Sequence, residues 1–391
     1  MRYASITERV AGLGTDKWAV HYAALKKIAA GERVLMLSIG EPDFAPPEAV
    51  SEAMIRSVRT GRVRYSSGRG EPSVLEAIAR HYARRTGRDI TPAQAVYMPG
   101  TQSALGFAIL ALAEAGDEVI VPEPYYVTYD GVVAATGATQ VRAVTRPRDR
   151  FHLTPEGLEA AITPRSRVLL LNSPSNPTGA VLSAAELGAI GEVCAAHDLW
   201  IVSDEVYSTL VFGNAAFASP FDDARLAERT VVVSSLSKSH AMPGFRAGWA
   251  IGPEEFATRM LPCAEAFLFG CQPFVQDATV YALSRDFPEC DAMRQAFERR
   301  ARAVLEAFGK KGAISAHMPE GGMFVFADVR RTGLSGEAFA MRLLEEENVS
   351  VMPGEAFGAA GSGHVRIGLV AEDALIADAA ARMAKLASRL A

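Results

Sequence analysis

Short apolar runs alternate with amphipathic stretches from about residue 46 to residue 252. The runs are short and rich in β-branched residues, which is typical of strands. Strands that alternate with helices predict βαβ units and a mainly parallel sheet. We therefore expect an α/β fold whose large domain holds a doubly wound, seven-stranded sheet. The expected strands are QAVYM, DEVIV, TQVRAV, RVLLLN, LWIVSD, TVVVSS and RAGWAIG.

The stretches between these runs carry apolar residues at helical spacing. Residues 103–116 read SALGFAILALAEAG, and residues 183–198 read SAAELGAIGEVCAAHD. Each stretch begins with Ser, which is a favourable residue at a helix N-cap. Both stretches therefore predict helices that pack on the sheet.

Beyond Pro253 the pattern changes to long helical stretches around residues 274–309, followed by the short runs AISAHM, GGMFVFADV and HVRIGLV. Further helices are expected at about 335–348 and 372–390. This order predicts a smaller α+β domain. We expect an N-terminal segment that packs with the small domain, a large domain and a small C-terminal domain, with bounds of 1–45, 46–284 and 285–391.

Composition narrows the class of protein. The chain has 391 residues, 49% of them hydrophobic and 22% charged, and a net charge of −5. This balance is that of a globular protein, and without a basic stripe it argues against nucleic acid or an anionic membrane as a partner. The four cysteines lack C-x-x-C spacing, and no signal peptide or membrane span is visible. We expect a cytoplasmic protein with buried thiols and no metal site.

In an open α/β sheet, ligands bind beyond the carboxyl ends of the strands, so residues that follow each predicted strand are candidates. Gly100, Thr101 and Gln102 follow QAVYMP and open a helix. The free N–H groups of a helix start suit a phosphate, although a glycine there is also ordinary loop chemistry. The tyrosines of PEPYYVTYD follow the second run, and they either pack in the core or stack on a flat ring.

Three further candidates follow later strands. Asp204 ends a very apolar run, so its carboxylate requires a cation or hydrogen-bond donor as a partner. Asn176 lies in the turn NSPSNPTG, whose shape requires the prolines and glycine but not an amide. Lys238 follows TVVVSS among small hydroxyl residues, and Arg246 begins the next apolar run. Lys238 is either a solvated turn residue or the centre of a site, because lysine is rarely buried without a reason.

Together these positions bring an acid, a lysine, an amide, phenols and phosphate donors to one sheet edge. This set suits pyridoxal 5′-phosphate, a pyridine ring that bears an aldehyde, a hydroxyl and a phosphate. A lysine amine forms a Schiff base with the aldehyde when burial and neighbouring cations lower its pKa. An acidic partner keeps the ring nitrogen protonated. We therefore expect pyridoxal 5′-phosphate as the cofactor.

Over essentially its whole length the chain resembles the fold-type I, class I and II aminotransferases. The resemblance is carried by GEPDF, Tyr65, PGTQ, NPTG, SDEVY, SLSK, FRAGW and HVRIG. It implies that Lys238 forms the Schiff base and moves the substrate proton, and that Asp204 pairs with the ring nitrogen. The other implied cofactor residues are Tyr207 and Asn176 at the ring oxygen, Tyr126 stacked on the ring, and Gly100, Thr101, Gln102, Ser235 and Arg246 around the phosphate.

The same resemblance implies a homodimer in which Tyr65 reaches the phosphate of the neighbouring subunit. It also implies that Arg366 clamps the substrate carboxylate, a task that suits a bidentate guanidinium. On the substrate side it adds the backbone of Gly40, the Asn176 amide and Trp18. The alternative interpretations are that Arg366 is an edge-strand arginine, that Tyr65 is a surface residue and that Trp18 packs in the core. Phe245 departs from the many relatives that carry tryptophan there, which we expect to alter packing rather than chemistry.

The implied activity is a ping-pong transamination between an L-amino acid and a 2-oxo acid. The runs WAVHYAAL, AHDLWIVSDEVYSTLVF and SLSKSHAMPGFRAGW look most similar to arginine:pyruvate aminotransferases. A cationic side chain requires a carboxylate in the pocket, and the candidates are Glu41, Asp43 and Asp16. The alternatives are an aspartate, alanine or aromatic aminotransferase, a carbon–sulfur β-lyase with the same cofactor, or a binding protein built on this fold.

Overall fold

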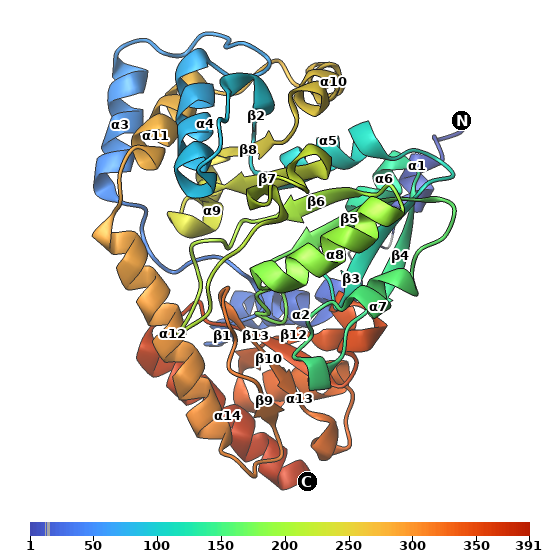
Figure 1. The fold of residues 1–391 in the computed structure, drawn as a ribbon. Helices are drawn as coiled ribbons and strands as arrows, with labels where there is room; N and C mark the ends of the chain where they lie inside the picture. Colours follow the sequence, from blue (N-terminus) through green and yellow to red (C-terminus); the bar gives the residue numbers. More distant parts are fainter. Residues whose placement is uncertain (12, 14–15) are drawn as a thin grey trace.

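Seven strands form one central sheet in the computed structural model, which describes residues 1–11, 13 and 16–391 (Figure 1). Only β8 runs antiparallel to its neighbours. The α/β fold and the mainly parallel sheet predicted from the sequence are confirmed. In sheet order the strands are β2 (Ala95–Met98), β8 (Gly248–Ile251), β7 (Thr230–Ser235), β6 (Trp200–Asp204), β5 (Ser166–Asn172), β3 (Glu118–Glu123) and β4 (Thr139–Val144).

Helices cover both faces of this sheet because successive strand residues point to opposite sides. Val231 and Val233 of β7 pack on one face, and Val232 packs on the other. The first face is covered by α5 (Thr101–Leu112), α6 (Tyr129–Thr136) and α10 (Glu254–Glu265). The second is covered by α4 (Pro72–Thr86), α11 (Pro273–Leu283), α7 (Pro155–Glu159) and α8 (Ala184–Ala196), with α3 (Glu48–Arg59) against α11.

A second, antiparallel sheet lies in the lower part of Figure 1. Its order is β12 (Met352–Pro353), β13 (His364–Gly368), β10 (Phe324–Asp328) and β9 (Ser315–Ala316). Val20, Ala24 and Leu37 join its core, and β1 (Leu35–Met36) pairs in parallel with β11 (Val349–Ser350). The helices that pack against this core are α2 (Ala19–Ala29), α12 (Pro288–Phe308), α13 (Gly336–Glu347) and α14 (Asp373–Leu390). Two short helices, α1 (Ile6–Arg9) and α9 (Leu236–Ser239), lie elsewhere in the chain.

Arg300 fixes the segment that carries GEPDF. The buried Arg300 guanidinium of α12 donates to both Asp43 carboxylate oxygens, at 2.7 and 3.0 Å, and to Asp373 of α14 at 2.8 Å. A buried guanidinium with two carboxylate partners holds backbone segments in place, because breaking either pair leaves charge poorly solvated. The chain around Gly40 is therefore anchored to α12 and α14.

Two expectations from composition concern the cysteines and the membrane. All four cysteines are free thiols, and Cys194 and Cys271 are buried while Cys263 and Cys290 are partly buried. Among the residues described, no helix has both the length and the apolar character that crossing a bilayer requires.

Candidate active site

The side chains expected to carry chemistry meet where β5, β6 and β7 end, because neighbouring parallel strands deliver their carboxyl ends to one edge. A cavity of about 180 Å³ lies there. Of the predicted cofactor residues within the described chain, only Gly100 and Tyr65 do not line it. The lining includes Thr101, Gln102, Tyr126, Asn176, Asp204, Tyr207, Ser235, Lys238 and Arg246, together with Tyr129, Asn172 and Ser237.

Lys238 lies in α9, directly after β7, and its Nζ donates a hydrogen bond to the Gly40 carbonyl oxygen. Burial lowers the pKa of Lys238 to about 8, the Glu41 carboxylate opposes this shift, and the guanidinium of Arg366 adds to it. An amine with this pKa has a useful neutral fraction near neutral pH. It is therefore suited to act as a nucleophile or a proton acceptor.

Asp204 ends β6 and is buried in the same cavity. The Tyr129 hydroxyl donates to its Oδ2 at 2.7 Å, and the Val206 backbone N–H donates to its Oδ1 at 3.2 Å. Burial raises the pKa of Asp204 to about 6, while these two hydrogen bonds and the Lys238 charge oppose the rise. The carboxyl is thus poised to meet a cationic group, such as a protonated ring nitrogen.

Tyr129 is a residue whose role sequence reasoning did not find. The apolar run before Asp204 showed that the acid needs a partner, but α6 and β6 lie 75 positions apart in sequence at this bond. Only the packing of α6 on the first face of the sheet brings the phenol to the carboxylate. The sole sequence signal was a third tyrosine in PEPYYVTYD.

We expect Tyr129→Phe to raise the pKa of Asp204 further, because the variant loses a hydrogen bond that stabilises the ionised carboxyl. The acidic limb of the pH profile of kcat/KM should move to higher pH by about one unit, since a hydrogen bond to a charged group contributes roughly 1.5 kcal/mol. Tyr125→Phe is the matched control, because within the described chain the phenol that donates to Asp204 is that of Tyr129. An unmoved acidic limb in Tyr129→Phe would show that this bond does not set the charge of Asp204.

Arg366, Asn176 and Tyr207 form a connected group, of which Asn176 and Tyr207 line the cavity and Arg366 lies behind Asn176. Arg366 Nη1 donates to Asn176 Oδ1 at 2.9 Å, and Asn176 Nδ2 donates to the Tyr207 hydroxyl at 3.4 Å. Arg366 Nη2 donates to the Ser38 carbonyl oxygen at 2.6 Å. The guanidinium is fully buried over the Phe324 ring, and burial lowers its pKa to about 10.

Arg366 lacks the anion that a buried cation requires. Its Nε is buried without a hydrogen-bond partner, and none of its partners in the described chain is a carboxylate. A buried unpaired donor is costly, and a carboxylate is the preferred bidentate partner of a guanidinium. The geometry therefore suits the α-carboxylate of an amino acid.

The start of α5 forms an anion-binding end of the cavity. Gly100 precedes the helix with φ 91°, and Thr101 Oγ1 donates to Ser235 Oγ at 2.8 Å. A Cβ at Gly100 would lie 2.3 Å from Arg246 Nη2, so only glycine lets the guanidinium approach the helix start. Free N–H groups, hydroxyls and an arginine are the donors that phosphate prefers.

The remaining predicted residues lie around this cavity or away from it. The Gly40 carbonyl contacts Lys238, and Gln102 accepts a hydrogen bond from Thr128 through its side-chain oxygen. Trp18, like Tyr126, packs against a small apolar cluster that includes Phe357, and it does not line the cavity. Tyr65 is 84% exposed and lies outside its own chain's cavity.

A second buried carboxylate follows Asp204 directly. Glu205 faces away from the cavity and pairs with Arg85 at 3.0 Å, and Ser219 also donates to it. Alternation along the chain sends the two acids to opposite sides. Asp204, the acid predicted from the sequence, thus lines the cavity, whereas Glu205 has a separate partner.

Comparison with known proteins gives the family. The family model for aminotransferase class I and II matches residues 32–383. The chain belongs to this family. It is 43% identical over 390 residues to an arginine–pyruvate transaminase of Pseudomonas aeruginosa, with 100% of this chain and 99% of that protein covered. It is 36% identical over 361 residues to an aspartate aminotransferase of Geobacillus stearothermophilus, which covers 90% of this chain and 92% of that protein.

Solved structures of class I and II aminotransferases share the fold of this chain. An aspartate aminotransferase from Rhizobium meliloti superposes with a TM-score of 0.94 at 31% identity, with 100% of both chains covered. A double mutant of the Thermus thermophilus aspartate aminotransferase gives 0.93 at 33%, covering 99% of this chain and 100% of that one. The predicted fold type and the predicted transaminase activity are confirmed.

Class I and II aminotransferases of this kind use pyridoxal phosphate, and the residues of this cavity fit that group. The buried acid, the lysine of lowered pKa and the helix start supply the groups that a ring nitrogen, an aldehyde and a phosphate require as partners. The buried Nε of Arg366, which has no hydrogen-bond partner in the described chain, is available to the carboxylate of an amino-acid substrate. When bound, the cofactor supplies an electron sink for the substrate carbon that loses its proton.

Proposed function

We propose that this aminotransferase uses pyridoxal 5′-phosphate to exchange an amino group between L-arginine and pyruvate in a ping-pong reaction. The observation that carries the substrate pair is the 43% identity, over the full chain, to an arginine–pyruvate transaminase. The relatives named for aspartate are less similar, at 36% and 37% identity. Aspartate is therefore the alternative amino donor.

In this proposal each cavity residue has a defined task. Lys238 would hold the cofactor aldehyde through its Nζ, and the same Nζ would carry the proton that the substrate α-carbon loses. Asp204 would pair with the ring nitrogen, and Tyr126 would stack on the ring. Gln102 and Asn176 line the same cavity. We assign Gln102 to the phosphate and Asn176 to both cofactor and substrate. The ring oxygen is held by Asn176 and Tyr207, the phosphate by Gly100, Thr101, Ser235 and Arg246, and the substrate α-carboxylate by Arg366.

Glu41 is the carboxylate that we assign to the side chain of arginine. Asp43 is engaged by Arg300, and the Asp16 side chain lies outside the described part of the chain. Glu41 has no ion-pair partner within the described residues, and its charge acts on the pKa of Lys238. A carboxylate beside the catalytic lysine can pair with a guanidinium, and such pairs are frequently bidentate.

We also propose a homodimer in which Tyr65 serves the cofactor phosphate of the neighbouring subunit. The tyrosine is exposed and lies against Phe269, with ring centroids 5.4 Å apart. Phe267 and Phe269 are exposed as well. Large exposed aromatic side chains that lie together are typical of protein–protein contacts.

The substrate proposal is tested with amino acids assayed side by side. We expect kcat/KM to be highest for arginine with pyruvate as acceptor, above aspartate, alanine and phenylalanine. Glu41→Gln should lower kcat/KM for arginine by about tenfold and leave alanine nearly unchanged, because only arginine loses a charged partner. Glu48→Gln, at an exposed carboxylate in the first turn of α3, is the matched control and should not change this ratio. A preference for aspartate, or ammonia release from cystathionine without an oxo acid, would contradict the proposed substrates.

A further inference from the structure

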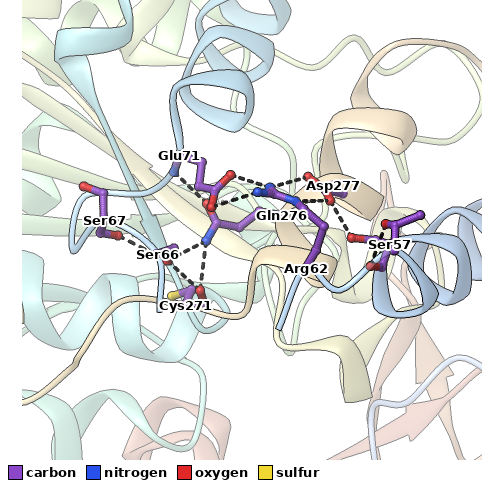
Figure 2. A network of polar contacts seen from close by, with 9 residues as sticks. Ser57, Arg62, Ser66, Ser67, Glu71, Cys271, Gln276 and Asp277 are labelled. Carbon is purple, nitrogen blue, oxygen red and sulfur yellow. Dashed lines mark hydrogen bonds and ion pairs between the residues drawn. The ribbon is translucent and has the colours of Figure 1, made fainter. Parts of the chain in front are cut away.

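A polar network ties the loop between α3 and α4 to the start of α11 (Figure 2). Arg62 donates to both carboxylate oxygens of Asp277, at 2.9 Å each. It also pairs with Glu71, the N-cap residue of α4. Asp277 accepts a further hydrogen bond from Ser57 of α3 at 2.5 Å. The guanidinium thus joins the loop to α11 and to the start of α4, and Asp277 extends the network to α3.

The same loop has a second anchor on the other side of Tyr65. The buried Gln276 side chain accepts a hydrogen bond from the Glu71 backbone N–H at 2.7 Å and donates to Ser66 Oγ at 3.0 Å. Ser66 donates in turn to the Cys271 carbonyl oxygen at 2.7 Å. A Cβ at Gly270 would lie 2.8 Å from the Ser66 carbonyl oxygen, so the two segments are in close contact.

These anchors flank a tip that its own chain leaves free. Arg62 lies three residues before Tyr65 and Ser66 lies one residue after it. The Tyr65 hydroxyl has no hydrogen-bond partner in the described chain, and Val63 and Phe269 beside it are also exposed. The network therefore orders the backbone on both sides of a side chain whose hydroxyl has no hydrogen-bond partner in the described chain.

Ordering the loop of residues 60–71 costs conformational entropy, and the loop contributes no helix or strand to the fold in return. Residues 60–71 contain no helix or strand between the end of α3 and the start of α4. Loops of this length without regular structure are usually functional or mobile. Fixing each backbone residue opposes folding by conformational entropy, whereas an ordered loop binds its target without that loss.

We propose that the network of Arg62, Glu71, Asp277 and Gln276 positions Tyr65 for the cofactor phosphate of a second copy of this chain. The inference rests on the homodimer of the proposed function. Arg62 is a positioning residue here, since it contacts neither cofactor nor substrate. Its loss should weaken cofactor binding in the neighbouring subunit, while its own subunit keeps its fold.

Hybrid dimers test this proposal. An Arg62→Ala chain is paired with a Lys238→Ala chain that carries a different affinity tag. Only the site that retains Lys238 can bind the cofactor covalently, and in the hybrid this site receives an intact loop from the other chain. Pyridoxal 5′-phosphate is titrated into the cofactor-free dimers, and borohydride fixes the covalently bound fraction for counting. Hydrogen exchange of residues 60–71 is measured without cofactor.

We expect the apparent Kd of the Arg62→Ala homodimer to rise about tenfold, equivalent to losing one charge-assisted hydrogen bond. The hybrid should return to the wild-type Kd, and residues 60–71 should exchange faster in chains that carry Arg62→Ala. Arg62→Lys should recover only part of the affinity, since lysine lacks the planar fork. Arg56→Ala, an exposed arginine of α3 paired only with Glu52, is the control and should match wild type.

A Tyr65→Phe chain is also paired with the Lys238→Ala chain. This hybrid separates the proposal that Tyr65 crosses the interface from the proposal that Arg62 positions it. If Tyr65→Phe is rescued in its hybrid but Arg62→Ala is not, Arg62 acts within its own subunit and the positioning proposal is wrong. An unchanged Kd in the Arg62→Ala homodimer also overturns it. If the Tyr65→Phe homodimer binds weakly and its hybrid is not rescued, Tyr65 does not cross the interface, and the proposed dimer arrangement fails together with the positioning role.

Discussion

Lys238→Ala is expected to lower kcat for transamination by at least about 10⁴-fold, the upper range for loss of a positioned general acid–base group. Two tasks are lost together, because in the proposed function the same Nζ anchors the cofactor aldehyde and moves the α-proton. The lowered pKa of about 8 that burial gives this amine is what equips it for both. Steady-state kinetics with arginine and pyruvate measure the loss.

The control for this variant is Lys310→Ala, at the exposed C-terminal side of α12. It should keep wild-type kcat and KM. The Lys238→Ala protein itself should retain its circular dichroism spectrum, since the lysine side chain makes one hydrogen bond to a backbone carbonyl and no ion pair in the described chain. A folded Lys238→Ala enzyme that transaminates at the normal rate would remove the basis of the proposed chemistry.

Asp204→Asn is expected to change activity and stability in opposite directions. The amide cannot hold a proton on the ring nitrogen, so kcat should fall by about 10³-fold, within the range for a lost charge partner in a buried site. In the cofactor-free protein, however, the ionised Asp204 is a buried carboxylate without a cation in direct contact. Replacing it with a neutral amide relieves the cost of burying that charge.

The sign and pH range of the stability change follow from the pKa. Burial raises the pKa of Asp204 from 3.8 to about 6, so the native state holds its proton more tightly than the unfolded chain. The protonated Asp204 makes its full contribution to the free energy of unfolding below pH 3.8. This contribution falls as the pH rises from 3.8 through about 6, and it is absent at higher pH. The loss is on the order of 3 kcal/mol. The cofactor-free Asp204→Asn protein should therefore melt higher than wild type at pH 8, by a margin that shrinks toward pH 4.

Calorimetry of both cofactor-free proteins at several pH values measures this margin. Asp198→Asn, at an exposed carboxylate, is the control and should show no such pH-dependent gain. If Asp204→Asn melts lower than wild type at pH 8, the ionised carboxylate stabilises the cofactor-free fold. The proposal that Asp204 is a buried carboxylate that lacks its cationic partner would then be wrong.

The sequence was most informative where local pattern and burial coincide. All seven apolar runs of the large domain became strands of one sheet, because runs of β-branched residues bounded by turns have few other stable arrangements. β11 and β12 were not expected, since they contain two residues each and are defined by their partners rather than by a pattern of their own. The domain bounds at residues 45 and 284 stay a prediction.

At the site, residues that follow strands were predictable and residues that reach it through packing were not. Lys238, Asp204 and Asn176 are delivered by strand ends, so their convergence followed from sheet topology. Tyr129 and Arg62 act through contacts 75 and 215 positions away in sequence, which no local motif encodes. The resemblance to aminotransferases named the roles of individual residues, and these roles stay proposals until the variants above are measured.

The most direct test is to locate the covalent attachment point of the cofactor. The purified protein is incubated with pyridoxal 5′-phosphate, reduced with borohydride, digested and analysed by tandem mass spectrometry. Our interpretation predicts a single modified peptide that contains SLSK, with the cofactor on Lys238. Modification of a different lysine, or of many surface lysines equally with Lys238 unmodified, would contradict the assignment of this cavity as the active site.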